Sequence, residues 1–189
     1  MAQTWSENHL GKPAKGGLEN MSMTTGFVPA DLETTIPFGY GIVSKTGKEG
    51  EVLLPGESGA SKQFLGITAF SQEATSYTKT HTGPVAKNAV YPNAYAAGDV
   101  VGIVTRGSVI CKVASGSLGI QAGDRICVIK GGFIDAYKNY PVANGGSNEA
   151  FLIDAVAESD GKANECISIQ LFGAAATLFK YNQEVKHEK

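Results

Sequence analysis

Arginine is scarce in this sequence, and a strong net charge of either sign is absent. Arg106 and Arg125 are its two arginines, and 16 basic residues set against 18 acidic ones leave a formal net charge of −2. Bidentate recognition of phosphate and of guanine depends chiefly on the planar guanidinium group of arginine. We therefore expect no nucleic acid as a direct partner.

Cysteines and long apolar runs are also few. Cys111, Cys127 and Cys166 are an odd number and cannot form a complete disulfide framework, so synthesis in a reducing compartment such as the cytoplasm is expected. The first residues lack a basic segment followed by an apolar one, and no stretch approaches about 18 apolar residues. The expected protein is neither secreted through a signal peptide nor membrane-spanning.

Glycine, in contrast, is abundant, and it separates the parts of an internal near-repeat. Residues 97–104 (AGDVVGIV) return 25 positions later as residues 122–129 (AGDRICVI). In both copies a Gly-Asp turn signal precedes a β-branched run, and a glycine, Gly107 or Gly132, then precedes another apolar dipeptide. The repeat predicts two strand-turn-strand units, and it supplies packing positions and turns rather than convergent nucleophiles, bases or ligands.

Short apolar runs broken by turns predict an all-β domain from Gly26 onward. In residues 165–172, three large aliphatic side chains alternate with Cys, Ser and Gln, which is typical of a half-buried antiparallel strand with one solvated face. We expect an antiparallel β-barrel or sandwich of about ten short strands. The predicted strands are Gly39–Val43, Glu51–Leu54, Gln63–Phe70, Val85–Tyr91, Asp99–Thr105, Ser108–Val113, Asp124–Lys130, Phe133–Tyr137, Ala150–Val156 and Glu165–Phe172.

The chain divides into three predicted units. Residues 1–25 contain scattered apolar side chains without strand or helix periodicity, which indicates an extended N-terminal arm. Residues 26–179 contain the predicted strands and form the β-rich domain. Residues 180–189 carry charges of both signs without an apolar face, so we expect a solvated C-terminal tail.

Two segments approach catalytic motifs without completing them. Gly41–Lys48 is similar to a phosphate-binding loop, but its last glycine comes one residue too late and Glu49 stands where a magnesium-binding Ser or Thr is needed. Gly56–Ala60 lacks the final glycine of a nucleophile elbow, and no predicted helix follows it. We interpret both segments as structural, the second as a flexible loop.

The remaining candidates for chemistry are isolated side chains. Cys111 could pair with His81 as nucleophile and base, but it alternates in phase with two valines, which predicts a buried, inert thiol. Asp99 and Asp124 could act as paired carboxylates, but an Asp after Gly at a strand entrance commonly bonds to nearby main-chain N–H groups. Spacings typical of metal ligands are absent from the sequence. We expect no catalytic residue, no cofactor and no metal.

An ordered series of short motifs resembles one known family. The series is Pro37–Val43 (PFGYGIV), Val52–Pro55, Phe64–Thr68, Tyr95–Val101, Ala122–Asp124 and Ile167–Leu171. Between about residues 26 and 172 the chain is similar to the structural cement, or head decoration, proteins of tailed phages. Members of that family are small β-rich proteins that bind the outside of an icosahedral head, commonly as trimers at three-fold or quasi-three-fold positions, and hold neighbouring capsomers together.

The resemblance implies a non-enzymatic virion protein. It would be made in the host cytoplasm, bind the outer surface of the head through the major capsid protein, associate with itself as a homotrimer, and stabilise the head against internal pressure. An extended arm can become ordered over an adjacent subunit at an entropy cost that new contacts offset. On that basis we expect Trp5, Leu10, Leu18 and Met21 to contact the capsid or another partner.

Two other functions fit parts of the sequence. A β-rich carbohydrate-binding or tail/adhesin module would expose several aromatic side chains on one strand face. The tyrosines that could stack on sugar rings show no common spacing in the sequence. They are Tyr77, Tyr91, Tyr95, Tyr137 and Tyr140. A small hydrolase would use Cys111 or Ser58 with His81, but the incomplete motifs argue against it.

Overall fold

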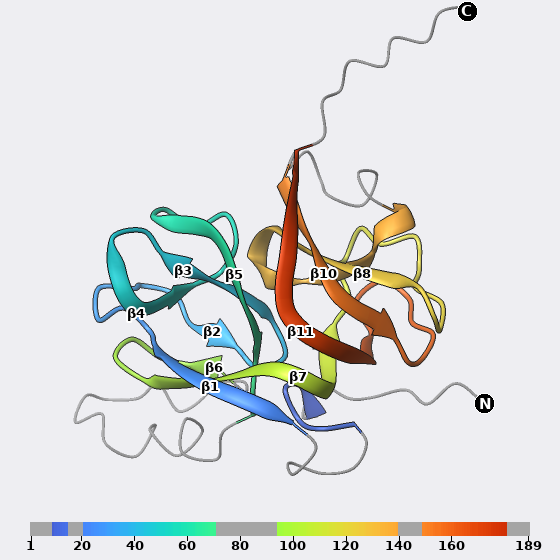
Figure 1. The fold of residues 1–189 in the computed structure, drawn as a ribbon, viewed down its shortest axis with the longest axis horizontal. Helices are drawn as coiled ribbons and strands as arrows, with labels where there is room; N and C mark the ends of the chain where they lie inside the picture. The colour runs from blue at the N-terminus through green and yellow to red at the C-terminus, as the bar shows by residue number, and fades with distance from the viewer. Residues whose placement is uncertain (1–8, 15–20, 71–93, 140–148, 181–189) are drawn as a thin grey trace, which may run out of the picture.

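The computed structural model describes residues 9–14, 21–70, 94–139 and 149–180, and nearly all of its regular structure is β-strand (Figure 1). The predicted all-β class is confirmed. No helix in the described ranges is long and apolar enough to cross a membrane. The strands are β1 (Ser22–Phe27), β2 (Ile36–Pro37), β3 (Gly41–Lys45), β4 (Lys48–Leu53), β5 (Ala60–Thr68), β6 (Ala94–Tyr95), β7 (Val100–Lys112), β8 (Arg125–Ile129), β9 (Ile134–Ala136), β10 (Glu149–Ala157) and β11 (Cys166–Lys180).

Five of these strands form a closed ring. β1 pairs with β7 from Ser22↔Arg106 to Phe27↔Val100, and it meets β4 at Phe27↔Glu51. Because β4, β3, β5 and β7 are neighbours in the sheet order, these contacts join β1, β4, β3, β5 and β7 into one ring. The β1–β4 contact is parallel, so the sheet is mixed, whereas the sequence predicts an antiparallel arrangement.

A second ring uses the other half of β7. β7, β11, β10, β8 and β9 follow each other in the sheet. The chain just after β7 returns to β9 through a Val113↔Ile134 bridge, and Ala114 N–H donates to Ile134 O at 3.0 Å. Figure 1 shows the two rings as adjacent lobes, with β3, β4 and β5 in one and β8, β10 and β11 in the other. The shared strand β7 connects them.

β7 differs from the prediction of two strands, Asp99–Thr105 and Ser108–Val113. It is one continuous strand, because Gly107 takes a φ of 123° and lets the chain bend without a turn. The strand changes partners around this glycine. Its first half pairs with β1 and β5, and its second half, from Gly107, pairs with β11.

The second copy of the near-repeat behaves as predicted. Gly131 and Gly132 both have positive φ, 79° and 81°, and form a tight turn after β8. β9 therefore folds back on β8, with Cys127 opposite Asp135. Strand-turn-strand is confirmed for this copy and wrong for the first, because two glycines in the left-handed region reverse the chain whereas the single Gly107 only bends it.

Most other strand predictions are confirmed with shifted ends. Val85–Tyr91 lies outside the described residues, and β1, β2 and β6 were not predicted. β2 and β6 contain two residues each, too few to show a periodic pattern. The predicted ranges that match strands are 39–43 (β3), 51–54 (β4), 63–70 (β5), 124–130 (β8), 133–137 (β9), 150–156 (β10) and 165–172 (β11).

β11 is buried on both faces over its first half. Ile167, Ile169 and Leu171 are at most 1% exposed, as the alternation predicts. The prediction of a solvated opposite face is wrong for Cys166 and Ser168, which are 3% and 5% exposed. The reason is that other parts of the chain cover this face: Cys166 packs in the apolar cluster of the first ring, and Ser168 Oγ lies 3.4 Å from Ser159 Oγ.

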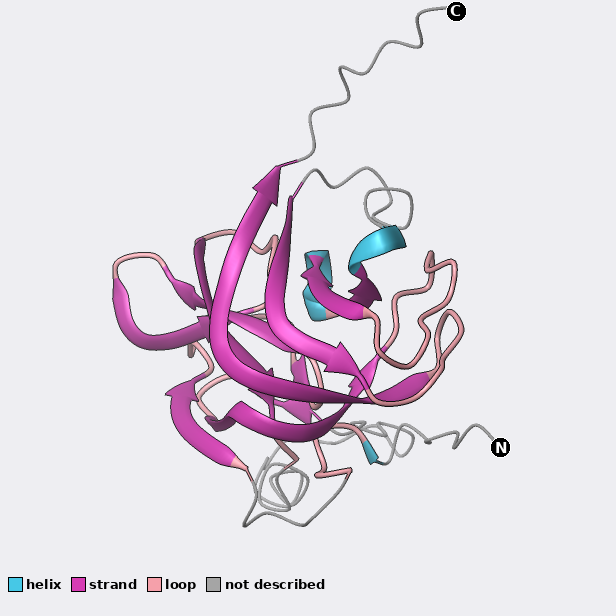
Figure 2. Cartoon of the chain, turned by 45° about the vertical axis from the view of Figure 1, so that its right-hand side comes forward, coloured by secondary structure: helices cyan, strands magenta, loops and turns pink. Residues whose placement is uncertain are grey.

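The core consists of two main apolar clusters. The larger one joins the lobes and includes Val104, Val109 and Ile169. The smaller one fills the first ring, where Phe38 meets Tyr95 edge-on with ring centroids 4.9 Å apart. Figure 2 shows the long paired strands β10 and β11 curving side by side along the second lobe.

Residues 9–14, which belong to the predicted arm, pack on β7. Gly11 N–H donates to Ile110 O at 2.9 Å, and Ile110 N–H donates to Lys12 O at 3.1 Å. A Cβ atom on Gly11 would lie 2.6 Å from Phe70 N, so this close approach needs glycine. The described parts of residues 1–25 are therefore in contact with the β-rich body, and β1 itself begins at Ser22.

Candidate functional site

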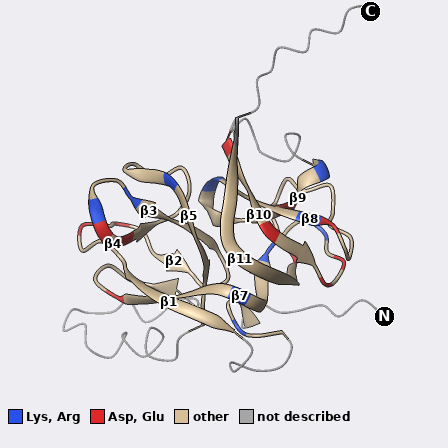
Figure 3. Ribbon diagram, in the orientation of Figure 1, with Lys and Arg blue, Asp and Glu red and all other residues tan. Residues whose placement is uncertain are grey.

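Met23, Phe27 and Val100 form an exposed apolar patch on the outer face of the β1–β7 pair, named here the seam patch. Their exposed fractions are 45%, 52% and 57%. Phe27 and Val100 are register partners, and Met23 shares their face because side chains alternate along a strand. β1 contains no charged residue, whereas charges gather on the β3–β4 side and around β8 and β9 (Figure 3).

The seam patch continues an apolar stripe that enters the core. Val104 lies on the same face of β7 as Val100 and is fully buried in the larger cluster. Gly102 lies between them, and Met23 Cε stands 3.2 Å from the place of a Cβ on Gly102. The same strand face is therefore buried at one end and exposed, within the described residues, at the other.

Tyr95 fixes the main chain at Gly102. Its hydroxyl accepts the Gly102 N–H at 3.1 Å and donates to Ala69 O at 2.8 Å. Burial raises the pKa of Tyr95 above its ordinary value, so the hydroxyl stays protonated and keeps its donor role at neutral pH. The backbone of the seam patch is consequently well supported.

The four predicted contact residues do not share one environment in the structure. Leu10 is 5% exposed and belongs to the core of the first ring, so in this conformation it packs inside its own chain. Met21 is half-buried and packs against the larger cluster. Trp5 and Leu18 lie outside the described residues. Sequence reasoning missed the seam patch, because residues 22–25 of β1 fall in the predicted arm and a single sequence does not give the register of β1 with β7.

Asp99 and Asp124 are local turn residues, as predicted. Asp99 Oδ2 accepts the N–H of Ala96 at 2.8 Å, and Asp124 Oδ2 accepts the N–H of Gln121 at 2.7 Å. Each carboxylate thereby closes its own turn, and neither is arranged with the other for acid-base chemistry.

The same turn occurs at two more places. In each of the four, the first residue's carbonyl accepts the fourth residue's N–H, and the acidic side chain at position four accepts the first residue's N–H. The third residue has positive φ in every case, which favours glycine. The turns are Leu54–Glu57, Ala96–Asp99, Gln121–Asp124 and Lys162–Glu165.

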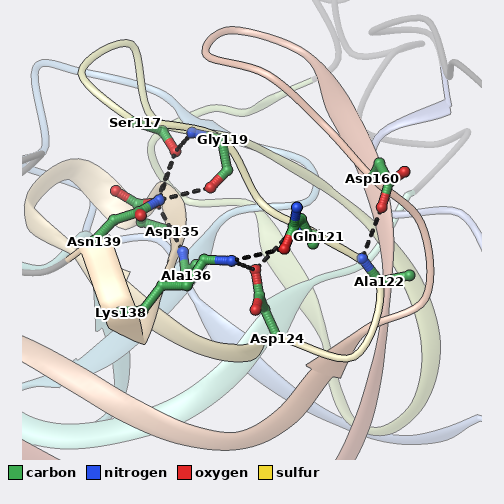
Figure 4. A network of polar contacts seen from close by, with 10 residues as sticks. All are labelled: Ser117, Gly119, Gln121, Ala122, Asp124, Asp135, Ala136, Lys138, Asn139 and Asp160. Atoms are coloured by element: carbon green, nitrogen blue, oxygen red, sulfur yellow. Dashed lines mark hydrogen bonds and ion pairs between the residues drawn. The ribbon is translucent and has the colours of Figure 1, made fainter.

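A buried polar network joins β9 to the loop before β8 (Figure 4). Asp135 is 1% exposed and accepts three hydrogen bonds through Oδ1, from Ser117 Oγ (2.7 Å), Asn139 Nδ2 (2.9 Å) and its neighbour's N–H (2.7 Å). Asn139 Nδ2 also donates to Gly119 O at 2.7 Å. These contacts hold the loop in place.

The edge of this network is held by the Asp124 turn. Lys138 Nζ lies 2.8 Å from Asp124 Oδ2 and donates to Gln121 Oε1 at 3.2 Å. Asp160 accepts the N–H of Ala122 at 2.8 Å from the other side (Figure 4). Each acidic group here is used in holding two segments together.

The three cysteines are buried thiols. Burial raises the pKa of Cys111 far above its ordinary value and that of Cys127 to about 12. Both therefore remain protonated near neutral pH, which is unsuited to nucleophilic attack or metal ligation. The predicted burial of Cys111 is confirmed, and His81 lies outside the described residues.

The other candidate sites hold no assembled chemistry among the residues that are described. Gly41–Lys48 forms β3 and the hairpin into β4, and Ser58 is exposed in a turn. Tyr95 is buried and Tyr137 is 39% exposed, so these two do not share a carbohydrate-binding face, while Tyr77, Tyr91 and Tyr140 lie outside the described residues. In the described ranges no three His, Cys, Asp or Glu side chains are grouped to hold a metal ion.

Comparison with known families matches residues 2–172 to the family described as "Structural cement protein (E217 gp24/Pam3 gp6)". The chain belongs to the structural cement protein family. The resemblance inferred from the motifs is confirmed, and the match extends into the N-terminal segment. Membership makes this cement protein a structural component of the phage virion, associated with the capsid.

The cement protein is also similar to a solved structure. A chain in "The capsid of Myoviridae Phage XM1" matches it with a TM-score of 0.53 and 16% sequence identity, over 93% of this chain and 94% of that one. At this identity the likeness concerns the fold, and it extends to nearly the whole of both chains. A comparison with curated proteins gives no match.

Proposed function

We propose that this cement protein binds the outer surface of the phage head, contacts the major capsid protein and stabilises the head against internal pressure. The observation that carries the proposal is the family match over residues 2–172. The described residues agree with a binding role, because the carboxylates of Asp99 and Asp124 close turns and the buried thiols of Cys111 and Cys127 stay protonated at neutral pH. The function then needs no chemical step.

The architecture is suited to carrying load between capsomers. β7 is paired on both edges and belongs to both rings, so the two lobes share a continuous main-chain ladder rather than a flexible linker. A body of this kind can transmit force between contacts on neighbouring subunits. Many symmetric copies, each making a modest contact, would raise the barrier to opening of the head through avidity and kinetic stability.

Self-association is part of the proposal. We expect homotrimers at three-fold or quasi-three-fold positions, because a cyclic assembly presents the same contact to three capsomers at once. Trp5, Leu18 and Met21 remain proposed contact residues. Leu10 would act on this assembly indirectly. Its buried side chain anchors the chain to the core at a point between Trp5 and Leu18.

Binding to undecorated heads tests the proposal. Purified protein is mixed with mature heads that lack it, and co-sedimentation is measured together with the temperature at which the heads disrupt. We expect saturation at about one trimer per three-fold position and a higher disruption temperature, since a ligand that binds only the closed head stabilises it. Absence of binding to every capsid form of the same virus would overturn the proposal.

Two control measurements separate this function from its alternatives. Cys111→Ala and Asp99→Asn should keep head binding, because neither side chain takes part in chemistry. A glycan array incubated with the isolated protein should stay unlabelled. Strong glycan binding without head binding would favour the carbohydrate-binding module instead.

A further inference from the structure

We infer that the seam patch is the surface through which the protein contacts the head, and that it packs on an uncharged, apolar surface of the assembled capsid lattice. The inference rests on the proposed function and specifies which residues perform it. Met23, Phe27 and Val100 would be buried in the bound state.

The seam patch differs from the other exposed apolar side chains. Leu118, Tyr137 and Phe172 are also exposed, at 71%, 39% and 48%, but they come from different elements. Scattered single apolar residues are normal on protein surfaces, whereas a contiguous patch usually marks an interaction site. Phe27 and Val100 are direct cross-strand partners, and Met23 reaches Gly102 two positions from Val100. The three side chains therefore present one surface.

The size of the patch favours a multivalent lattice over a free partner. Three side chains that are about half exposed offer on the order of 300 Å² of accessible surface. A stable interface between two free proteins buries about 800 Å² on each side. A second free copy packed on this patch alone would consequently bind weakly. On a head, the same small contact is repeated in every copy and is strengthened by avidity.

The charge pattern specifies the chemistry of the occupant. β1 contains no charged residue, and on the paired stretch of β7 the charged residue is Arg106, opposite Ser22 at the far end. Glu51 of β4 is the register partner of Phe27, but its carboxylate is already ion-paired with Lys45 at 2.8 Å. A charged partner surface would have to be desolvated against this patch without a compensating group. An apolar, uncharged partner surface fits it. Binding through the seam patch should therefore change little between low and moderate salt.

The backbone beneath the patch is already held in one conformation before a partner binds. Tyr95 holds the Gly102 backbone through hydrogen bonds of 3.1 Å to its N–H and 2.8 Å to Ala69 O. A supported backbone loses little conformational entropy when a partner covers it. Met23, which lies across Gly102, has an unbranched thioether that can adapt to an irregular surface.

The experiment compares two exposed phenylalanines. Phe27→Ser removes the centre of the seam patch, and Phe172→Ser removes a phenylalanine of similar exposure, 48% against 52%, outside it. Affinity for undecorated heads and the melting temperature of the free protein are measured for both variants and for Val100→Thr. We expect Phe27→Ser to weaken head binding at least about tenfold and Val100→Thr by less, while Phe172→Ser binds like the parent.

The outcomes separate the inference from the proposed function. If the parent binds heads and Phe27→Ser binds equally well, the seam patch is the wrong surface although the function stands. If the parent itself does not bind, the proposed function fails. Ile103, 1% exposed in the smaller core cluster, supplies the reference variant Ile103→Ala. If Phe27→Ser lowers the melting temperature as much as Ile103→Ala does, the patch is covered by the protein's own chain, which also overturns the inference. A loss of trimers with Phe27→Ser would assign the patch to self-association instead.

Discussion

Asp99 and Asp124, which lie 25 residues apart in the sequence, make the same hydrogen bond in two separate turns. Each carboxylate accepts the N–H of the residue three positions before it, at 2.8 Å for Asp99 and 2.7 Å for Asp124. The first turn leads into β7 and the second into β8. The near-repeat in sequence is therefore a repeat of structure at the entrance to both rings.

The main-chain partners of the two turns correspond as well. Val28 N–H donates to Asp99 O at 2.9 Å, and Ala157 N–H donates to Asp124 O at 2.9 Å. In return, the glycine before each Asp donates to the carbonyl of Val28 or of Ala157, at 3.1 and 2.8 Å. β1 and the end of β10 thus occupy equivalent places, and the two lobes are built from a common unit that diverges at Gly107.

The first prediction concerns the Asp99 turn. Asp99→Ala removes the acceptor for the Ala96 N–H and should lower the free energy of unfolding by about 1–2 kcal/mol. Asp99→Asn keeps an acceptor oxygen in the same place and should lose less than half of that. Urea unfolding of the three proteins measures both values. Equal losses in the two variants would mean that charge, rather than the acceptor, stabilises the turn.

The sequence predicts local features of this fold better than its connections. Gly-Asp turns, β-branched runs and the burial of Cys111 follow from residue chemistry over a few positions, and these predictions are confirmed. The continuity of β7 could not be predicted in the same way, because Gly107 suits both a turn and a bend. The difference is decided by β11, whose Leu171 pairs with Gly107 and holds the chain extended.

Which residues are exposed was harder to predict for a related reason. Leu10 looks like a free anchor in sequence, since no periodic pattern surrounds it, but long-range bonds between Gly11 and Ile110 place it in the core. Met23 looks like a further residue of the arm and Phe27 like a residue at the start of the domain, until the register with β7 puts them on one exposed face. Such placements depend on pairing between distant segments, which single-sequence patterns do not contain.

The second prediction concerns Asn164, which has a φ of 65°. The other residues with positive φ in the described part of the chain are glycines. Asn164 occupies the third position of the Lys162–Glu165 turn, where the other three turns have glycine. Asn164→Ala should cost about 1 kcal/mol, because a Cβ without a local polar contact disfavours this conformation. Asn164→Gly should leave the melting temperature unchanged or raise it slightly. A glycine variant that melts lower than the alanine variant would contradict this account.

The third prediction separates two roles of the N-terminal segment. A protein that starts at residue 9 retains Leu10 and the Gly11–Ile110 hydrogen bond, so its melting temperature should stay close to that of the parent. A protein that starts at residue 15 loses both and should be destabilised by about 2–5 kcal/mol, the range for removal of a buried leucine. Calorimetry measures the difference, with Leu10→Ala in the full chain as the matched variant. Equal stability of the two truncated proteins would show that residues 9–14 add nothing to the fold.

The same two truncated proteins test the proposed role of Trp5 when their affinity for undecorated heads is measured. If Trp5 contacts the capsid, the protein that starts at residue 9 should bind more weakly than the parent although it is equally stable. Trp5→Ser in the full chain should reproduce that loss. Parent-like binding by both variants would remove Trp5 from the contact residues.

The last prediction is a loss of stability at alkaline pH that depends on Cys127. Its pKa is raised from an ordinary value of 9.0 to about 12, mainly by burial, so the unfolded chain releases this proton at a lower pH than the folded protein does. Between these two values the unfolded state binds fewer protons. The contribution of Cys127 is therefore fully present below about pH 9 and is lost as the pH rises towards 12.

Urea unfolding at about pH 8 and pH 10.5 measures this dependence. Cys127 should contribute a decrease of about 2 kcal/mol between the two pH values, since one pKa unit corresponds to about 1.4 kcal/mol. Cys127→Ala should be less stable than the parent at pH 8, by about 1 kcal/mol for the small void, yet lose correspondingly less on going to pH 10.5. Val128→Ala, which empties a neighbouring and fully buried position without a titrating group, should keep the alkaline loss of the parent. If Cys127→Ala loses as much stability as Val128→Ala over this interval, the Cys127 thiol is not the group that titrates. The alkaline loss would then come from another buried acid, such as Cys111 or Tyr95, whose pKa values are also raised by burial.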